Sequence, residues 1–235
     1  MKILITNDDS IKSPGLWELV RLAKAYGEIK VIAPAHEQSG KSHGINIHDG
    51  LELRKFDSEV KSFSLNSLPA DCVRVASYGL DWEFDIVLSG INNGLNLGED
   101  IFYSGTCAAA TEAAMMGKKA LAFSAPPGAF KVVSTVFNEI MEFLISSKLF
   151  ENGNLFNINV PAKPKGIKLT FQGKNHYDTR FVPEDELYYQ RGRHHFEKEE
   201  ANINSDVWAI YNNYISVTPM NYDRTDYQIY QKFSK

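Results

Sequence analysis

Short apolar runs alternate with helix-like stretches along the first 150 residues of this 235-residue chain. The runs are rich in β-branched and aliphatic residues and cover positions 3–6, 29–34, 85–89 and 119–124. Stretches in which apolar residues recur every three or four positions cover 16–26, 69–78, 106–116 and 130–149. Unbroken apolar runs are typical of strands buried on both faces, and the second pattern is typical of helices that cover such a sheet. The alternation predicts an α/β fold with a doubly wound, mostly parallel sheet.

The pattern changes at two places along the chain. Positions 45–54 and 59–65 predict a β-hairpin inserted after the second strand. After about residue 150 the periodicity weakens, so we divide the chain into a core, residues 1–150, and a C-terminal extension, residues 151–235, that continues the fold. Within the extension we expect strands at 155–160 and 167–172, a strand pair at 207–217 and a helix at 225–233.

Composition and charge narrow the classes of function. Apolar residues make up 43% and charged residues 23%, as in ordinary globular proteins. The net charge is −4 and no basic tract is present, which argues against binding to a nucleic-acid polymer. No apolar run approaches the ~18 residues of a membrane span, and the N-terminus reads as a strand rather than a secretion signal. Cys72 and Cys107 form no CxxC pair, so they indicate buried thiols in a reducing cytoplasm rather than a zinc site.

Three loops rich in polar residues or glycine follow strands of the predicted sheet. They contain residues 7–10, 39–42 and 90–96. In an open parallel sheet, ligands bind outside the carboxyl ends of the strands, close to the point where the strand order reverses. We therefore expect these three loops to meet in space and to form the functional site.

Asp8 and Asp9 stand next to each other at the end of the first predicted strand. Two adjacent carboxylates near buried protein repel each other, and a divalent cation between them removes this cost. Oxygen ligands favour a hard ion such as Mg²⁺, Mn²⁺ or Ca²⁺ over zinc. Ser39 and Asn92, in the other two loops, could add a hydroxyl and an amide oxygen. The alternative is that one aspartate caps a helix or forms a turn, and that Ser39 and Asn92 are ordinary turn residues.

Ser104, Gly105 and Thr106 open the predicted helix at 106–116. Free N–H groups at a helix N-terminus favour an anion, so a bound phosphate is one interpretation, and simple capping by Ser104 or Thr106 is the other. The sequence contains no Walker A loop, no GxGxxG fingerprint in a strand–helix context and no GxSxG nucleophile elbow. These absences disfavour an ATPase, a dehydrogenase and an α/β-hydrolase.

Several segments together resemble the SurE family, the stationary-phase survival proteins. The matching segments are ILITNDDS (3–10), PG (14–15), VIAPAHEQSGKS (31–42), PADCV (69–73), SGINNGLNLGEDIFYSGTCAAATEAAMMG (89–117) and VTPMNYDRTDY (217–227). The resemblance runs through nearly the whole chain and is most specific over 89–117. Two residues depart from the family's common pattern, because Ser10 replaces a glycine and Cys107 replaces a small aliphatic residue.

Members of this family are metal-dependent phosphatases, so the resemblance implies a 5′-nucleotidase that hydrolyses nucleoside 5′-monophosphates, with short polyphosphate as a further substrate to test. It implies one divalent ion, Mg²⁺, Mn²⁺ or similar, and catalytic roles for Asp8 and Asp9. Carried over by position, the metal ligands are Asp8, Asp9, Ser39 and Asn92, and the phosphate-binding residues are Asn96, Ser104, Gly105 and Thr106. A Rossmann-like catalytic core and a C-terminal extension used in a homodimer or homotetramer are implied as well.

Two other functions remain open at this point. A haloacid-dehalogenase-type phosphatase carries two aspartates separated by one residue, whereas Asp8 and Asp9 are adjacent. A non-catalytic nucleotide-binding or interaction module would use the aromatic C-terminal part mainly as an assembly surface. Trapping of a phospho-aspartate would favour the first, and nucleotide binding without phosphate release would favour the second.

Overall fold

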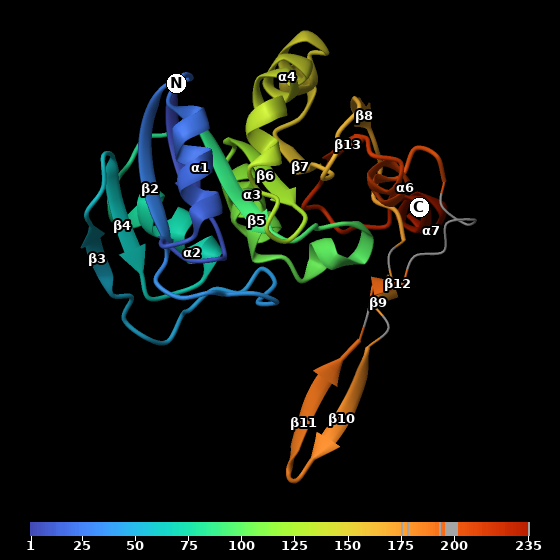
Figure 1. Ribbon diagram of the computed structural model, residues 1–235, viewed down its shortest axis with the longest axis horizontal. Helices are drawn as coiled ribbons and strands as arrows, with labels where there is room; N and C mark the ends of the chain where they lie inside the picture. Colours follow the sequence, from blue (N-terminus) through green and yellow to red (C-terminus); the bar gives the residue numbers. More distant parts are fainter. Residues whose placement is uncertain (175, 178, 193, 196–201, 235) are drawn as a thin grey trace.

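A nine-stranded sheet runs through the centre of the computed structural model, which describes residues 1–174, 176–177, 179–192, 194–195 and 202–234 (Figure 1). The strand order is β3-β4-β2-β1-β5-β6-β7-β13-β8. The strands are β1 (Lys2–Thr6), β2 (Glu28–Pro34), β3 (Leu53–Phe56), β4 (Lys61–Leu65), β5 (Ile86–Asn93), β6 (Lys119–Ala125), β7 (Leu155–Asn159), β8 (Ile167–Leu169) and β13 (Ile215–Pro219).

The six strands from β4 to β7 are parallel, whereas β3 and β13 pair antiparallel with β4 and β7. The chain moves outward from β1 through β2 to β4 and then returns to place β5 on the other side of β1. Ile3 therefore pairs with both Ile29 of β2 and Ile86 of β5. The strand order reverses between β1 and β5, which confirms the doubly wound, mostly parallel sheet and marks the expected ligand position at its carboxyl edge.

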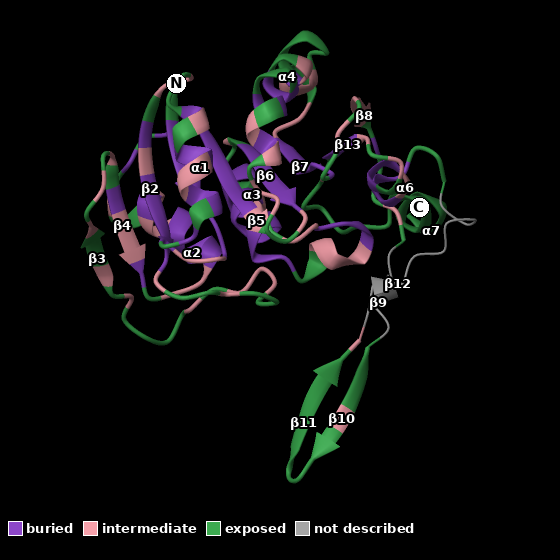
Figure 2. Cartoon of the chain, viewed as in Figure 1, coloured by how far each residue is buried: buried purple, intermediate pink, exposed green. Residues whose placement is uncertain are grey.

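Helices cover both faces of the sheet and bury alternate residues of β1. Ile3 and Ile5 belong to one apolar cluster with α1 (Pro14–Ala23) and α4 (Val132–Ser146), while Leu4 belongs to another with α2 (Pro69–Arg74) and α3 (Gly105–Met115). This alternation follows from the two-residue period of a strand. Figure 2 shows the central strands and the inner helix faces buried. A π-helical turn (75–79), a 3₁₀ turn (98–102) and α5 (Leu149–Asn152) complete this region.

Three sequence predictions differ from the structure. The expected strand pair at 207–217 is wrong, because residues 206–211 form α6 (Asp206–Tyr211) before β13 begins. The Ser205 hydroxyl caps this helix by accepting a hydrogen bond from the Trp208 N–H. The strand expected at 85–89 also extends to Asn93, because the chain passes Gly90 at a φ of 133° that suits glycine. The expected hairpin is confirmed only over its inner part, since β3 begins at Leu53.

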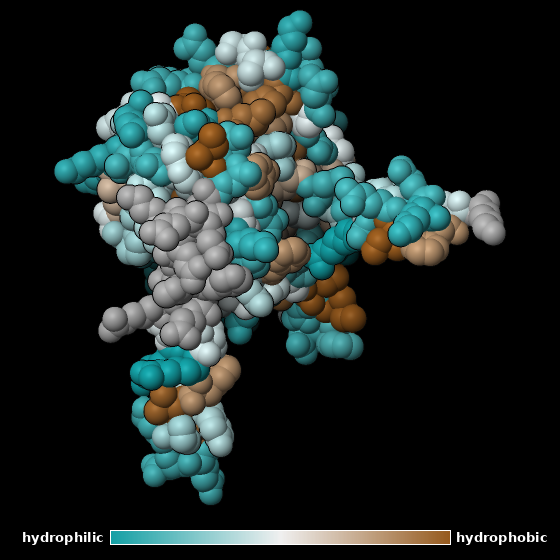
Figure 3. Space-filling view, turned by 90° about the vertical axis from the view of Figure 1, so that its right-hand side faces the viewer, coloured by the Kyte–Doolittle hydropathy of each residue, from teal (hydrophilic) through white to brown (hydrophobic). Residues whose placement is uncertain are grey.

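The chain beyond residue 150 joins the same sheet and then leaves it. β7, β13 and β8 extend the sheet, whereas the hairpin of β10 (Arg180–Glu184) and β11 (Leu187–Arg191) projects away from the body (Figure 1). Short strands β9 (His176–Tyr177) and β12 (His194–His195) pair at its base, and α7 (Tyr227–Phe233) lies near the C-terminus. Figure 3 shows apolar side chains on the projecting hairpin. None of the helices in the described ranges has the length and apolar character of a membrane span.

Candidate functional site

The acidic pair lies where β1 ends, beside the carboxyl end of β5. Asp8 is only 4% exposed, and its Oδ1 accepts a 2.5 Å hydrogen bond from the Thr106 hydroxyl. The Thr106 backbone N–H donates to Asp8 Oδ2 at 3.2 Å. Asp9 is half-buried, and its Oδ2 accepts from the backbone N–H of Asn93 at 3.0 Å. One carboxylate is thus held by the start of α3 and the other by the end of β5.

The pKa of each of these two carboxyl groups is raised above its ordinary value. Burial raises the pKa of Asp8 to about 6, the Thr106 hydroxyl opposes this shift, and the charge of Asp9 adds to it. Burial also raises the pKa of Asp9, against the effect of the Asn93 N–H and together with the charge of Glu37. A cation beside these oxygens would favour their ionised forms.

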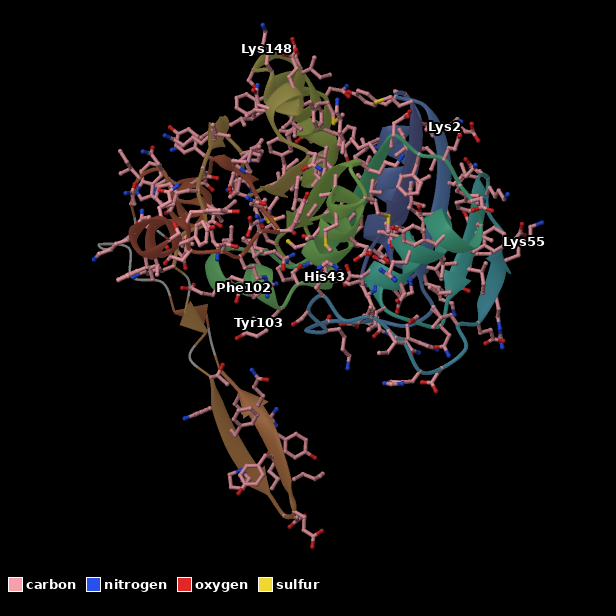
Figure 4. The ribbon with its side chains drawn as sticks, turned by 180° about the vertical axis from the view of Figure 1, so that it is seen from behind. Lys2, His43, Lys55, Phe102, Tyr103 and Lys148 are labelled. Atoms are coloured by element: carbon pink, nitrogen blue, oxygen red, sulfur yellow. The ribbon has the colours of Figure 1, made fainter. Side chains whose placement is uncertain are left out.

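Hydrogen bonds of the main chain and of side chains hold the second loop, which follows β2, beside Asp8 and α3. The Gln38 N–H donates to the Asp8 carbonyl at 2.8 Å, which fixes the start of the loop beside β1. Ser39 is exposed, and its hydroxyl donates to Glu37 Oε1 at 2.6 Å. Further along, His43 Nε2 lies 2.8 Å from Glu112 Oε2 of α3. Figure 4 shows His43 with Phe102 and Tyr103 at the same edge of the molecule, opposite Lys2 and Lys148.

The third loop presents one asparagine oxygen and buries the other asparagine. Asn92 is half-buried, and its side-chain nitrogen donates to the Gly94 carbonyl at 2.9 Å, which leaves its amide oxygen for a ligand. Asn96 is 7% exposed, and its side-chain nitrogen donates to Ser124 Oγ at 2.9 Å. The Asn96 carbonyl accepts from the side chains of Asn157 and Asn159 at 2.8 and 2.9 Å. Asn96 is therefore held rigidly by β6 and β7.

The start of α3 is occupied by groups of the chain itself. The Ser104 hydroxyl caps the helix by accepting from the Cys107 N–H at 3.1 Å, as the capping interpretation expected. Thr106 binds Asp8 with both its hydroxyl and its N–H. A Cβ at Gly105 would lie 2.9 Å from the Asp8 Cβ, so only glycine lets helix and carboxylate approach this closely.

Sequence reasoning missed Glu37, Asn157 and Asn159 as parts of this region. The sequence could have pointed to Glu37, because its carboxylate stands two residues before Ser39 in the second loop. Asn157 and Asn159 stand at alternate positions of an otherwise apolar strand and are fully buried. A polar pair on one face of a buried strand needs buried partners, and this pattern could have pointed to Asn96.

The four predicted metal ligands offer oxygen atoms only, namely the Asp8 and Asp9 carboxylates, the Ser39 hydroxyl and the Asn92 amide oxygen. Donors of this kind suit a hard divalent ion. Asn7 Oδ1, immediately before the pair, is buried and has no hydrogen-bond partner. Among the described residues, no group of three or more His, Cys, Asp or Glu side chains is arranged to hold a metal. A site built from two carboxylates and two neutral oxygens is consistent with that result.

The chain is similar to known proteins over nearly its whole length. The family model described as "Survival protein SurE" matches residues 3–179. The chain is 37% identical to the 5′-nucleotidase SurE of Natranaerobius thermophilus, over 100% of this chain and 98% of that protein. It is 35% identical to the 5′-nucleotidase SurE of Alkaliphilus metalliredigens, over 99% and 97% of the two chains. The crystal structure of the SurE protein from Aquifex aeolicus superposes with a TM-score of 0.83 at 33% identity, covering 99% of this chain and 98% of that chain.

Proposed function

Because this chain belongs to the Survival protein SurE family, we propose that it is a 5′-nucleotidase that hydrolyses nucleoside 5′-monophosphates to nucleoside and phosphate. Relatives that match nearly the full length of this chain at 34–37% identity carry that name. A 5′-nucleotidase is a phosphoric monoester hydrolase. The observation that carries the proposal is the position of Asp8 and Asp9, because both carboxylates meet at the point where the strand order reverses.

Metal dependence is part of this proposal. One divalent cation, Mg²⁺, Mn²⁺ or similar, would be held by Asp8, Asp9, Ser39 and Asn92. Such an ion supplies positive charge for the phosphoryl oxygens and makes water more acidic. The oxygen-only donor set and the repulsion between the two carboxyl groups support this assignment.

The two aspartates differ in what they can do during hydrolysis. Both oxygens of Asp8 accept hydrogen bonds from Thr106, so Asp8 is a fixed ligand with little freedom to move. Asp9 is more exposed than Asp8. Its Oδ2 accepts the hydrogen bond from the Asn93 N–H, and its Oδ1 takes no part in that bond. We assign to Asp9 the orientation of the attacking water and the acceptance of its proton.

The substrate phosphate would lie between the third loop and the start of α3. Asn96, Ser104, Gly105 and Thr106 are the residues proposed to bind it. The N-terminus of a helix favours an anion, and Gly105 brings this helix start close to Asp8 and therefore to the proposed metal ion. Buried bonds from Asn157 and Asn159 hold Asn96 in one position, which supports a role in positioning.

The C-terminal extension, residues 151–235, is proposed to assemble the protein into a homodimer or homotetramer. The β10–β11 hairpin exposes Phe181, Leu187 and Tyr188, and α7 has no buried residue. Exposed apolar side chains of this density mark association surfaces. We also retain the expected cytoplasmic location, and short polyphosphate as an additional substrate to be tested.

A panel of nucleoside monophosphates assayed with Mg²⁺ and Mn²⁺ tests the proposed function. We expect phosphate release from AMP or GMP that stops with EDTA and returns when metal is added. Asp9→Asn should keep the fold, because an amide oxygen can still accept from the Asn93 N–H, and should lose most of the turnover. Unchanged turnover in that variant at saturating metal, or no release from any nucleotide, would refute the proposal.

A further inference from the structure

A pocket of about 370 Å³ opens beside Asp9, between the start of α1 and the loop after β6. Its walls include Asp9, Ser13, Glu37, Asn93, Gly128 and Phe130. This volume falls within the range of roughly 300–1,000 Å³ that is typical of sites for small molecules. Because one wall is the Asp9 carboxylate, a molecule in this pocket would reach the phosphoryl centre with one of its ends.

The charges of the pocket select a neutral occupant. Asp9 and Glu37 contribute two carboxylates, and none of the described residues that line the pocket is Lys, Arg or His. The proposed metal ion would offset the charge of Asp9, but the Glu37 carboxylate would still repel a second phosphate placed here, and no described side chain of the lining supplies a positive charge. A neutral group with hydroxyl or amino donors would instead find carboxylate acceptors.

The hydroxyl of Ser13 is an additional polar group in the lining of the pocket. The residue is only 8% exposed and is the N-cap of α1, yet its side chain makes no capping hydrogen bond. A buried serine that leaves its helix uncapped is unusual, because this hydroxyl normally bonds an N–H of the first turn. The hydroxyl therefore remains available to an occupant of the pocket, of which Ser13 is a lining residue.

Asn93 connects the pocket to Asp9 and to the loop after β6 that contains Gly128. Its backbone N–H donates to Asp9 Oδ2 at 3.0 Å, and its side-chain oxygen accepts from the Gly128 N–H at 2.8 Å. These bonds orient the side-chain nitrogen of Asn93 as the donor that it can offer to a ligand. They also hold the loop that carries Phe130 at a fixed place relative to Asp9.

Phe130 forms an aromatic wall of the pocket. Its side chain is half-buried and packs against the apolar cluster under α1 and α4, so the core supports the ring from behind. A ring that is supported on one side and lines a pocket on the other can stack against a flat group. Nucleobases are flat, and every base has a face on which an aromatic side chain can stack.

We propose that this pocket binds the nucleoside part of the substrate, with Phe130 stacking on the base and Ser13, Glu37 and Asn93 bonding its polar groups. The inference rests on the proposed nucleotidase function and adds where the neutral half of the substrate lies. The competing location is a larger groove of about 830 Å³ along α3, which is lined by Ser104, Arg74 and Phe102 but by neither Asp8 nor Asp9.

The test compares AMP with ribose 5-phosphate, which keeps the sugar and the phosphate but lacks the base. Phe130→Ala removes the stacking face, and we expect the preference in kcat/KM for AMP over ribose 5-phosphate to fall about tenfold, in line with the usual strength of base–aromatic stacking. Phe130→Leu keeps apolar volume against the core and should show a similar loss, whereas Phe130→Tyr should keep the preference. Phe102→Ala, in the groove along α3, is the matched control.

Binding of free adenosine, measured by calorimetry, gives a readout that does not depend on turnover. Phe130→Ala and Phe130→Leu should weaken adenosine binding about tenfold, and Phe102→Ala should leave it unchanged. A normal AMP preference and normal adenosine binding in folded Phe130→Leu would overturn the assignment, and losses in Phe102→Ala would place the nucleoside along α3. Failure of the wild-type protein to hydrolyse AMP in any metal would instead refute the nucleotidase function.

Discussion

Thr106 holds the Asp8 carboxylate with two groups at once, its hydroxyl at 2.5 Å from Oδ1 and its backbone N–H at 3.2 Å from Oδ2. This contact joins the end of β1 to the start of α3 across 98 positions of the chain. It fixes the direction in which one carboxylate faces the proposed metal site. Without a polar partner, a carboxyl group as buried as Asp8 would lose more of its tendency to ionise.

Thr106→Val removes the hydroxyl and keeps the shape and the backbone N–H. The pKa of Asp8, already raised to about 6 by burial, should rise further because the hydroxyl lowers it. We expect turnover of AMP to fall about tenfold, as for the loss of one hydrogen bond to a charged group, and the metal concentration for half-maximal activity to increase. Activity assays over a Mn²⁺ titration measure both effects.

Thr111→Val on the same helix is the control, because its hydroxyl donates to the Cys107 carbonyl at 2.8 Å and lies away from Asp8. Urea unfolding of both variants separates a loss of activity from a loss of stability, because Thr106→Val also leaves the buried Asp8 Oδ1 without this partner. Equal activity of Thr106→Val and Thr111→Val would contradict the role given to the Thr106 hydroxyl.

Gly105→Ala should disturb the same contact by steric overlap. The added Cβ would lie 2.9 Å from the Asp8 Cβ and 3.1 Å from Asp8 Oδ2, both closer than carbon and oxygen atoms normally approach. Asp8 or the start of α3 must move, and displacement of a reacting group by about 1 Å can cost on the order of 100-fold in rate. Phosphate release from AMP measures this loss.

Gly79→Ala is the matched substitution, because its Cβ would meet Val75 at an ordinary 3.6 Å, and its activity should stay near that of the wild type. If Gly105→Ala keeps full turnover, close approach of the helix to Asp8 is not required for the site.

Glu112 connects the second loop to the helices behind it. It is 5% exposed, and its two oxygens bind His43 at 2.8 Å and Arg74 at 2.9 Å. Glu112→Gln removes the charge, so we expect a loss of about 2 kcal/mol in the free energy of unfolding, as when buried charged partners lose their bonds. Because the loop also carries Ser39, the metal concentration needed for activity should rise as well.

The pH dependence of this effect has a defined sign. Burial alone would raise the pKa of Glu112, but the bonds from His43 and Arg74 lower it below the usual 4.5. A lowered pKa stabilises the fold above the unfolded-state value, and this contribution is lost as the pH falls through the folded-state value. The contribution of the Glu112 charge to stability should therefore shrink as the pH falls below about 4.5, and with it the stability difference between wild type and Glu112→Gln.

Glu139→Gln, at an exposed position of α4, is the control for Glu112→Gln and should change stability little at any pH. Urea titrations at several pH values provide the measurement. A stability difference for Glu112→Gln that keeps growing as the pH falls below about 4.5 would show that the bonds to His43 and Arg74 do not stabilise the charged form.

The sequence predicted that Asp8, Asp9 and Asn92 come to one edge of the sheet, but it did not predict the contacts around them. Asp8 and Asp9 follow β1 and Asn92 lies at the end of β5, and the apolar runs of both strands are easy to recognise, so the parallel order alone brings these residues together. The bonds of Thr106 to Asp8 and of Asn157 to Asn96 depend on how distant segments pack, which no local pattern specifies. The helix at 206–211 was missed because its apolar residues are equally compatible with a short strand, and only its burial against neighbouring elements decides.

Asp206 joins three segments near the third loop and provides a separate test of the fold. It is fully buried, its Oδ1 accepts from the N–H groups of Gly173 and Val207 at 2.7 Å each, and its Oδ2 accepts from the Gly98 N–H at 3.0 Å. Asp206→Asn replaces one acceptor by a donor that faces an N–H group. We expect the free energy of unfolding to fall by about 2 kcal/mol, the usual cost of an unsatisfied buried group.

Urea unfolding measures the effect of Asp206→Asn, and Asp226→Asn is the matched control. Asp226 accepts from the Gln228 and Ile229 N–H groups at the exposed start of α7, where water can replace a lost bond, so its change should stay below about 1 kcal/mol. Since Gly98 ends the loop that contains Asn96, Asp206→Asn should also lower activity more than Asp226→Asn does. Equal stability of the two variants would mean that Asp206 does not hold the third loop in place.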